Sequence, residues 1–548
     1  MFSRPLCLVA FVIGTAFAVP LQEPLGLSRP ESWGPTSRPA PSIQLDHGTF
    51  MGTSDGTVYK FLGIPFAKPP MGNLRFSLPV AVDPYNDTHA ATTFGPACPQ
   101  QSFTVPVVPK VVQKLVDIIM NTIYRRITRE SEDCLSLNVI VPAGTKPDEK
   151  LPVVVWIYGG VIVKRSIKLK EPVIYVSMNY RVSAFGFLAS QEVKDAGVGN
   201  LGLQDQRLAL RWVQKYISAF GGDPTKVTIW GESAGAISVA LHLLTNGGNT
   251  EGLFRGAFMQ SGSPIPIGDI VNGQADYDGL VAETGCSGAS NTLQCLREVD
   301  YKKLKTAVDA TPNMFSYQSL RLAWLPRADG VFLTDGPQAL VQKGSIANVP
   351  LITGDCDDEG TFFSLSNLNV TTESELHSYI KQIYMPAASD SDIDSVLQAY
   401  PADPSQGSPF GTGIFNALTP QFKRLAAFQG DLIFQAPRRF FLNATAAAQP
   451  TWSFLSKRFK LAPGIGSAHG TDLLNVYMGG DMTDYLVNFV NNLDPNGAKR
   501  LYWPQYTLDS RKLLTFWDGI IRPLSITTDD YRVEGFNILT NLSLQFPM

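Results

Sequence analysis

The stretch Lys226-Val-Thr-Ile-Trp-Gly-Glu-Ser-Ala-Gly-Ala236 decides the fold of this chain. Its β-branched and aromatic half, Lys226–Trp230, predicts a buried strand, and the small and apolar residues 236–244 predict a helix. Between them stands Gly231-Glu-Ser-Ala-Gly235, the G-x-S-x-G pattern of a sharp strand-to-helix turn. A side chain at either glycine would collide with the neighbouring strand or helix. The pattern predicts that Ser233 presents its hydroxyl at the end of a sheet, before a helix N-terminus that favours negative charge.

A G-x-S-x-G also occurs by chance as a loop serine between two glycines, so the pentapeptide alone does not assign a nucleophile. Its surroundings favour catalysis, because a predicted strand precedes it and a predicted helix follows it. The segment Ala219-Phe-Gly-Gly-Asp-Pro-Thr225 also closes one helix and turns into that strand. The rest of the chain can therefore be searched for the partners of Ser233.

A serine nucleophile needs a base that takes its proton and an acid that orients the base. In an α/β-hydrolase these residues follow in the order serine, acid, histidine. The five histidines are His47, His89, His242, His377 and His469. The first two precede the serine, the third would point away on the following helix, and the fourth lies in a predicted helix over 371–384. His469, in the glycine-rich loop Pro463–Gly470 after a predicted strand, is favoured as the base over the alternative of a surface histidine.

The acid is expected after the predicted strand Pro350–Thr353. The carboxylates that follow this strand are Asp355, Asp357, Asp358 and Glu359. An acidic cluster in such a place is also often a solvated loop or a helix N-terminus. Spacing alone does not select Glu359 over Asp357 or Asp358.

The composition is that of a soluble globular protein with a large core: 548 residues, 44% hydrophobic, 17% charged and a net charge of −3. The weak negative charge disfavours nucleic-acid binding. Arg4, an apolar run over 6–17 and Ala16-Phe-Ala18 predict a signal peptide over residues 1–18. This run is too short to span a membrane, and no later stretch is long enough either. We expect a secreted, extracellular protein without a transmembrane segment.

Residues 19–42 are rich in Pro and Ser and predict a loose N-terminal arm. Cys98 with Cys134, and Cys286 with Cys295, are natural disulfide pairs in an oxidising compartment, although four cysteines allow three pairings. Cys356 is then expected to be a buried thiol. Four Asn-x-Ser/Thr sequons are consistent with secretion and predict glycosylation at Asn86, Asn369, Asn443 and Asn541.

After Cys134, strand-like runs alternate with helical ones. Strands are predicted over 137–141, 153–158, 173–178, 226–230, 254–260, 350–353 and 451–455, and a helix over 203–220. Alternation of this kind predicts an α/β fold, with an open and largely parallel sheet that helices cover on both faces.

The segment between Cys98 and Cys134 carries apolar residues at helical spacing over 109–124. The commoner fate of such a pattern is a surface helix that packs on the core. The alternative is a lid, tied at both ends by a disulfide, whose apolar face swings over a pocket or onto a lipid surface. The lid interpretation rests mostly on the resemblance described next.

The chain resembles the type-B carboxylesterase/lipase family, the cholinesterase-like branch of the α/β-hydrolases. Within it, the chain is most similar to secreted fungal lipases of the Candida rugosa lipase type, from about Gly63 to near the C-terminus. The motifs that carry the resemblance are Glu132-Asp-Cys-Leu135, Asn179-Tyr-Arg181, Phe185-Gly-Phe187, Gly199-Asn-Leu-Gly-Leu-Gln-Asp-Gln-Arg207, Gly231-Glu-Ser-Ala-Gly235, Asp358-Glu-Gly-Thr361, Ser408-Pro-Phe410 and Asn416-Ala-Leu-Thr-Pro-Gln-Phe-Lys-Arg424.

The resemblance implies Ser233 as nucleophile, Glu359 as acid and His469 as base. It also implies both disulfides, a lid between Cys98 and Cys134, and a single α/β-hydrolase catalytic domain over 43–548. The implied reaction is the hydrolysis of carboxylic esters, such as acylglycerols or other lipophilic esters, through an acyl-enzyme. No metal or cofactor is implied, since this chemistry needs none.

Two features bear on the implied substrate. Cholinesterases carry a choline-binding tryptophan in the first disulfide loop, and this chain has none there, so a quaternary-amine ester is not expected. Phe362 and Phe363 beside the acid are candidates for the lining of an acyl tunnel. Without the resemblance, core packing would be the favoured role for both.

The oxyanion hole of this fold needs two backbone N–H donors. One belongs to Ala234, after the nucleophile, and the other to a glycine-rich loop that begins here at Gly159-Gly160. In the family a third glycine, an aromatic residue and a longer loop follow, whereas here Gly160 runs directly into Val161. About fifteen residues are missing from the loop of this fold.

Two explanations of the short loop stand side by side. Either the gene model omits these residues, or the chain is as written and catalysis is impaired, by about 100- to 1000-fold for one lost donor. The other intact motifs favour the first explanation. The rival functions are a catalytically impaired α/β-hydrolase that acts as a binding module, and a carboxylesterase that is not a lipase.

Overall fold

The computed structural model describes residues 40–103, 110, 112–114, 129–157, 162–477, 480–498, 500–519 and 521–548. The chain divides into two units, residues 1–39 and 40–548, and the described residues belong to the second. The predicted signal peptide and most of the predicted arm lie outside them. Strand β1 (Ser42–Leu45) begins at the last residue of the predicted arm.

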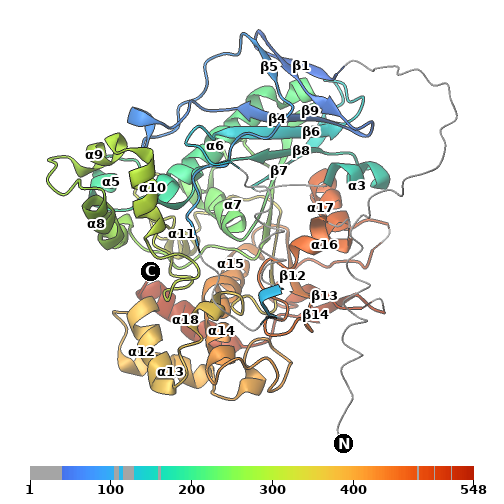
Figure 1. Cartoon of the computed structure of the whole chain (residues 1–548). Helices are drawn as coiled ribbons and strands as arrows, with labels where there is room; N and C mark the ends of the chain where they lie inside the picture. Colours follow the sequence, from blue (N-terminus) through green and yellow to red (C-terminus); the bar gives the residue numbers. More distant parts are fainter. Residues whose placement is uncertain are drawn as a thin grey trace, which may run out of the picture. The chain divides into compact units, whose positions relative to one another are not determined.

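An eleven-stranded sheet organises the described residues, in the order β14-β13-β12-β11-β10-β9-β7-β8-β6-β4-β3 (Figure 1). Neighbouring strands from β8 to β13 are parallel, and antiparallel pairs close both ends. The predicted open, largely parallel sheet is confirmed. The strands are β3 (Thr53–Ser54), β4 (Val58–Pro65), β6 (Ser136–Pro142), β7 (Leu151–Trp156), β8 (Ile174–Met178), β9 (Gly222–Glu232), β10 (Gly256–Gln260), β11 (Leu351–Cys356), β12 (Thr451–Lys457), β13 (Lys512–Trp517) and β14 (Leu524–Thr528).

A small second sheet joins β1, β2 (Gly48–Met51) and β5 (Thr88–Ala90). The helices are α3 (Ile162–Leu169), α4 (Ser183–Phe187), α5 (Gln191–Asp195), α6 (Leu201–Tyr216), α7 (Ala234–Leu244), α8 (Gln274–Glu283), α9 (Thr292–Glu298), α10 (Tyr301–Asp309), α11 (Pro337–Gln342), α12 (Glu373–Tyr379), α13 (Asp390–Ala399), α14 (Phe422–Gly430), α15 (Ala436–Thr445), α16 (Leu473–Tyr477), α17 (Asp481–Asn492) and α18 (Val533–Gln545).

Helices cover both faces of the central sheet (Figure 1). Successive side chains of a strand point to opposite faces, and β7 divides its residues accordingly. Val153 and Val155 pack in one core with residues of α6 and α7. Val154 and Trp156 pack in another with residues of α3 and α17. Because helices bury both faces of the sheet, the sequences of the central strands are continuous apolar runs rather than alternating ones.

The predicted elements agree with the observed ones to within a few residues. Each of the seven predicted strands is present, as β6 to β12. The helix predicted over 203–220 is α6, which begins two residues earlier and tightens into a 3₁₀ turn over Ile217–Phe220. Of the helix predicted over 109–124, residues 110 and 112–114 are described and are helical, and the remainder lies outside the described residues.

Both predicted disulfides, Cys98–Cys134 and Cys286–Cys295, are present, and Cys356 is a buried free thiol. The four sequon asparagines have exposed side chains, with Asn86 and Asn369 outside helices and strands, Asn443 in α15 and Asn541 in α18. Within the described ranges, no helix is both long and apolar enough to cross a bilayer.

Candidate active site

The turn between β9 and α7 forms as its glycines predict. Ser233 stands between the last residue of the strand and the first of the helix, with φ +56° and ψ −125°. A Cβ on Gly231 would lie 2.3 Å from the backbone of Gly235, and one on Gly235 would lie 2.7 Å from the carbonyl oxygen of Ile157. Only glycine therefore allows the strand and helix to meet this closely, and the turn leaves the Ser233 side chain half-buried at the sheet edge.

Two loops bring His469 and Glu359 to this serine. His469 Nε2 lies 2.7 Å from Ser233 Oγ, and His469 Nδ1 lies 2.6 Å from Glu359 Oε2. The second carboxylate oxygen of Glu359 accepts a hydrogen bond from the backbone N–H of Cys356 at 2.6 Å, which fixes its orientation. The carboxylate keeps the Nδ1 proton in place, so Nε2 is left to accept the Ser233 hydroxyl proton. The three residues selected in the sequence are thus joined by one hydrogen-bonded chain.

Three carboxyl groups surround the buried imidazole. Burial lowers the pKa of His469, but Glu359, Glu232 and Asp472 outweigh it and raise the pKa to about 9. Burial raises the pKa of Glu232 to about 8 and that of Asp472 to about 6. The environment therefore stabilises the imidazolium that forms when the histidine takes a proton.

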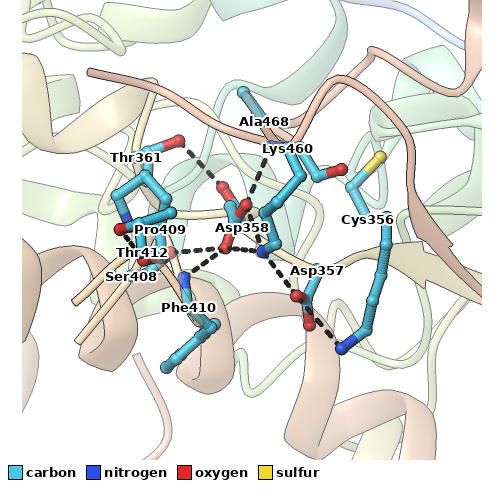
Figure 2. Close-up of polar contacts among 12 residues, drawn as sticks. Cys356, Asp357, Asp358, Thr361, Ser408, Pro409, Phe410, Thr412, Lys460 and Ala468 are labelled. Carbon is cyan, nitrogen blue, oxygen red and sulfur yellow. Dashed lines mark hydrogen bonds and ion pairs between the residues drawn. The ribbon is translucent and has the colours of Figure 1, made fainter. Parts of the chain in front are cut away.

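Spacing in the sequence also left Asp357 and Asp358 as candidates for the acid, but these two carboxylates bind a lysine. Lys460 Nζ lies 2.5 Å from Asp357 Oδ2 and 2.8 and 2.7 Å from the two oxygens of Asp358. Figure 2 shows the ammonium group between the two carboxylates. Both aspartates are buried, and their charges are engaged by this lysine. Glu359 is the carboxylate of this loop that contacts the histidine.

Asp358 also connects three loops to one another. Its carboxylate accepts a hydrogen bond from the backbone N–H of Phe410 at 2.8 Å (Figure 2). It accepts another from the backbone N–H of Ser467, also at 2.8 Å. Its own backbone N–H donates to the carbonyl oxygen of Ser467. The loop that carries Glu359 is therefore fastened to the loop that carries His469, two residues before the histidine.

Two of the remaining histidines have polar partners of their own. His242 is fully buried in α7, where its Nε2 lies 3.0 Å from Gln206 Oε1. His377 pairs with Asp394 at 3.6 Å. These contacts agree with the selection of His469 by order along the chain.

Aromatic side chains enclose the imidazole. The ring of Phe434 lies 4.7 Å from that of His469, and the ring of Phe363 lies 5.1 Å from it, centroid to centroid. Both phenylalanines, with Phe362, belong to one buried apolar cluster. Val112, from the segment between Cys98 and Cys134, belongs to the same cluster, and a Cβ on Gly464 would lie 2.8 Å from its side chain. The predicted lid segment therefore contacts the loop that carries His469.

Of the three candidate donors to the oxyanion hole, only Ala234 lies in the described part of the chain. Ala234 opens α7 directly after the serine, where helix N–H groups have no partner within the helix. Gly159 and Gly160 lie outside the described residues. Strand β7 ends at Trp156 and α3 begins at Ile162, so few residues connect the two.

One nearby residue was not predicted from the sequence. Glu232, directly before the serine, places its Oε1 3.6 Å from His469 Nε2. Among the described residues this buried oxygen has no hydrogen-bond partner. Its position inside the G-x-S-x-G pattern was the available signal, but its proximity to a histidine 237 positions later depends on the fold.

Comparisons with known proteins place this chain among esterases and lipases. The model of the carboxylesterase family matches residues 39–520. Lipase 4 of Diutina rugosa is 44% identical, over 92% of this chain and 97% of its own length. A secreted triacylglycerol lipase of Gibberella zeae is 40% identical, over 91% and 90%. Among solved structures, EstA of Aspergillus niger matches with a TM-score of 0.78 and 27% identity, covering 93% of this chain and 99% of its own.

Proposed function

Since this chain belongs to the carboxylesterase family and is a serine hydrolase of carboxylic esters, we propose that Ser233 is its nucleophile, His469 its base and Glu359 its orienting acid. The observation that carries this assignment is the hydrogen-bonded chain from Ser233 Oγ through both nitrogens of His469 to Glu359 Oε2. We assign these roles to one catalytic domain over residues 43–548.

In the first half of the reaction, Ser233 Oγ attacks the ester carbonyl carbon while its proton passes to His469 Nε2. The negative charge on the former carbonyl oxygen is stabilised by backbone N–H groups, of which Ala234 at the start of α7 supplies one. His469 then gives its proton to the leaving alkoxide, and the carbon–oxygen bond breaks. The products are an acyl-enzyme on Ser233 and a free alcohol.

In the second half, a water molecule attacks the acyl carbon and passes a proton to His469 Nε2. Breakage of the bond to Ser233 Oγ releases the carboxylic acid, and the serine recovers its proton from the histidine. Glu359 keeps its hydrogen bond to Nδ1 throughout and stabilises the imidazolium. No metal or cofactor takes part in these steps.

The proposed substrates are acylglycerols or other lipophilic esters. The names of the lipase relatives support this class, and so do the apolar rings of Phe363 and Phe434 beside the imidazole. We further propose that the disulfide-closed segment 98–134 is a lid, because Val112 packs against the loop that carries the base.

We propose that the protein is secreted after cleavage of residues 1–18. The names of similar proteins, such as the secreted lipase of Gibberella zeae, support this, and so do the two disulfides. The exposed asparagines of the four sequons are accessible to glycosylation, which we propose as well. Treatment of the secreted protein with an N-glycosidase would lower its apparent mass, and an unchanged mass would contradict glycosylation.

The test of the assignment is hydrolysis of p-nitrophenyl butyrate by the chain as written, beside Ser233→Ala and Ser238→Ala. Ser238 is a buried serine on the next turn of α7, where its hydroxyl donates to the backbone carbonyl of Ala234. We expect activity that the first substitution abolishes and the second retains. Equal loss in both variants would contradict the role of Ser233.

The short glycine loop supports a second candidate, an impaired hydrolase that acts as a binding module. The binding-module candidate predicts that the chain and its Ser233→Ala variant are equally inactive toward p-nitrophenyl butyrate. Restoring a full glycine loop then separates the explanations, because recovered activity would assign the defect to the gene model. A non-lipase esterase would show no jump in rate when its substrate exceeds the solubility limit.

A further inference from the structure

Four large apolar side chains are more exposed than any others of their kind in the described part of the chain. Ile414 is 73% exposed, Phe415 76%, Leu461 83% and Ile521 86%. We call these four residues the apolar rim. Exposure of such large apolar side chains to water costs hydrophobic free energy. Where exposed apolar residues gather, they often mark an interaction site.

Hydrogen bonds tie together the three loops that carry the rim. Asn416 Oδ1, beside Phe415, accepts from the backbone N–H of Gly464 at 2.9 Å. The carboxylate of Asp518 accepts from the backbone N–H groups of Phe459 and Lys460, at 2.7 and 2.9 Å. The described residues of loops 411–416, 459–466 and 517–523 are therefore neighbours, and the four rim residues lie on adjacent loops.

The loop that presents Ile414 and Phe415 is held in place from inside. Lys423 Nζ donates to Thr412 Oγ1 at 2.7 Å and to the carbonyl oxygens of Gly413 and Phe415 at 2.8 and 3.2 Å. One buried ammonium group thus fixes the backbone of the loop, while its two apolar side chains stay in solvent. The contacts of Lys423 therefore hold Ile414 and Phe415 in their exposed positions.

The rim lies at the edge of the sheet that holds the proposed active site. Strands β11, β12 and β13 are parallel, so their carboxyl ends share one edge. Glu359 follows β11, Leu461 and His469 follow β12, and Ile521 follows β13. Residues 408–410 join this edge through the hydrogen bond from Phe410 N–H to Asp358.

The charges of these loops are compatible with an apolar phase. Loop 411–416 has no charged residue, Lys460 is paired with two carboxylates, and Asp518 accepts two backbone N–H groups. Arg522 is exposed beside Ile521, and a long cationic side chain reaches water from the edge of an apolar surface. A stable protein interface uses about 20–30 residues a side, so four residues fit a second copy of this chain poorly.

We propose that the apolar rim inserts into the surface of an aggregated ester substrate, such as an acylglycerol droplet, and holds the active-site edge against it. This inference rests on the proposed function and adds to it a docking surface distinct from the segment 98–134. The droplet supplies both the apolar phase that covers the four side chains and the ester that enters the site.

The test measures binding without turnover. In a Ser233→Ala background, the full chain is mixed with trioctanoin droplets and separated by flotation. Ile414→Ser with Phe415→Ser, Leu461→Ser and Ile521→Ser are each expected to lower the droplet partition by about tenfold or more per buried side chain. Val331→Ser, a residue 56% exposed on a turn outside the three loops, is the matched control and should leave the partition unchanged.

With Ser233 restored, the rim variants should hydrolyse soluble p-nitrophenyl butyrate as the parent does. Rim variants that float with droplets as well as the parent would overturn the proposal. So would a parent that sediments as a dimer and dissociates on Leu461→Ser, because a second copy would then cover the rim. A parent inert toward p-nitrophenyl butyrate would count against the proposed function instead, while flotation would still decide the role of the rim.

Discussion

Lys460 Nζ lies 2.7 Å from Asp358 Oδ2, so an ion pair joins the loop of the proposed base to the residue directly before the proposed acid. The pair is largely buried, with a fifth of the lysine side chain exposed and the aspartate fully covered. The same ammonium group also neutralises Asp357. The relative position of Glu359 and His469 therefore depends on a cation that touches neither of them.

Lys460→Met is expected to destabilise the protein and to slow it. It leaves two buried carboxylates without their cation, which costs about 3 kcal/mol of unfolding free energy, the low end for a partly exposed pair. Small displacements of the two loops should lower kcat toward a soluble ester by about ten- to hundredfold. Urea unfolding and initial rates check the two effects.

Lys457→Met is the matched control for this change. Its ammonium group lies 3.4 Å from Asp357 and is more exposed, so the loss should be about 0–1 kcal/mol with little change in kcat. Equal effects of the two substitutions would show that the position of Lys460 has no special role.

The pH dependence of the rate should reflect the carboxyl groups around His469. The base acts in its neutral form, and burial lowers its pKa less than Glu359, Glu232 and Asp472 raise it, to about 9. The value of kcat/KM is therefore expected to rise with pH through the alkaline range. Glu232→Gln removes one of the groups that raise the pKa of His469. The rise in kcat/KM should therefore move to lower pH.

A pH–rate profile on a soluble ester measures that displacement. Glu375→Gln, at an exposed cap of α12, should leave the profile unchanged. If Glu232→Gln displaced the rise to higher pH, the proposed electrostatic role of Glu232 would be wrong.

Gly235→Ala should reduce both stability and activity. Alanine is usually favoured over glycine inside a helix by about 1 kcal/mol, but here the new Cβ would lie 2.7 Å from the Ile157 carbonyl oxygen. Relief of that contact must move α7 or β7, at a cost of about 1–3 kcal/mol. Gly279→Ala in α8 meets nothing within 4 Å and should be neutral or stabilising, and thermal unfolding of both variants compares them.

Removal of the Cys98–Cys134 disulfide should destabilise the chain more than removal of Cys286–Cys295. The first closes a loop with a sequence separation of 36 and the second a loop of 9. Loop-closure entropy gives about 4 and about 3 kcal/mol, respectively. Paired Cys→Ser variants under denaturant measure the two losses, and the reverse order would show that native contacts dominate over chain entropy.

The sequence predicted the central elements because local patterns determine them. The β-branched run before Ser233 and the small residues after it required no distant partner to be interpreted, and β9 and α7 lie where they indicate. The short edge strands β13 and β14 were not predicted. Strand β13 pairs with β12, whose residues lie about sixty positions earlier in the chain, and β14 pairs in turn with β13.

The candidate site was predictable only in part for a related reason. Order along the chain selected His469, but spacing left Asp357, Asp358 and Glu359 equivalent, and only the resemblance favoured the last. What separates them physically is Lys460, a residue about a hundred positions later that binds the two aspartates. Contacts of this kind arise from the sheet order and cannot be inferred from neighbours in the sequence.

The wide separation of the proposed triad along the chain has a consequence for biosynthesis. Ser233 and His469 stand 236 residues apart, and a ribosome adds about 5–20 residues per second. A growing polypeptide therefore contains the serine for about 12–47 s before the histidine is made. During that interval the proposed nucleophile lacks its proposed base, so the unfinished chain is expected not to hydrolyse esters.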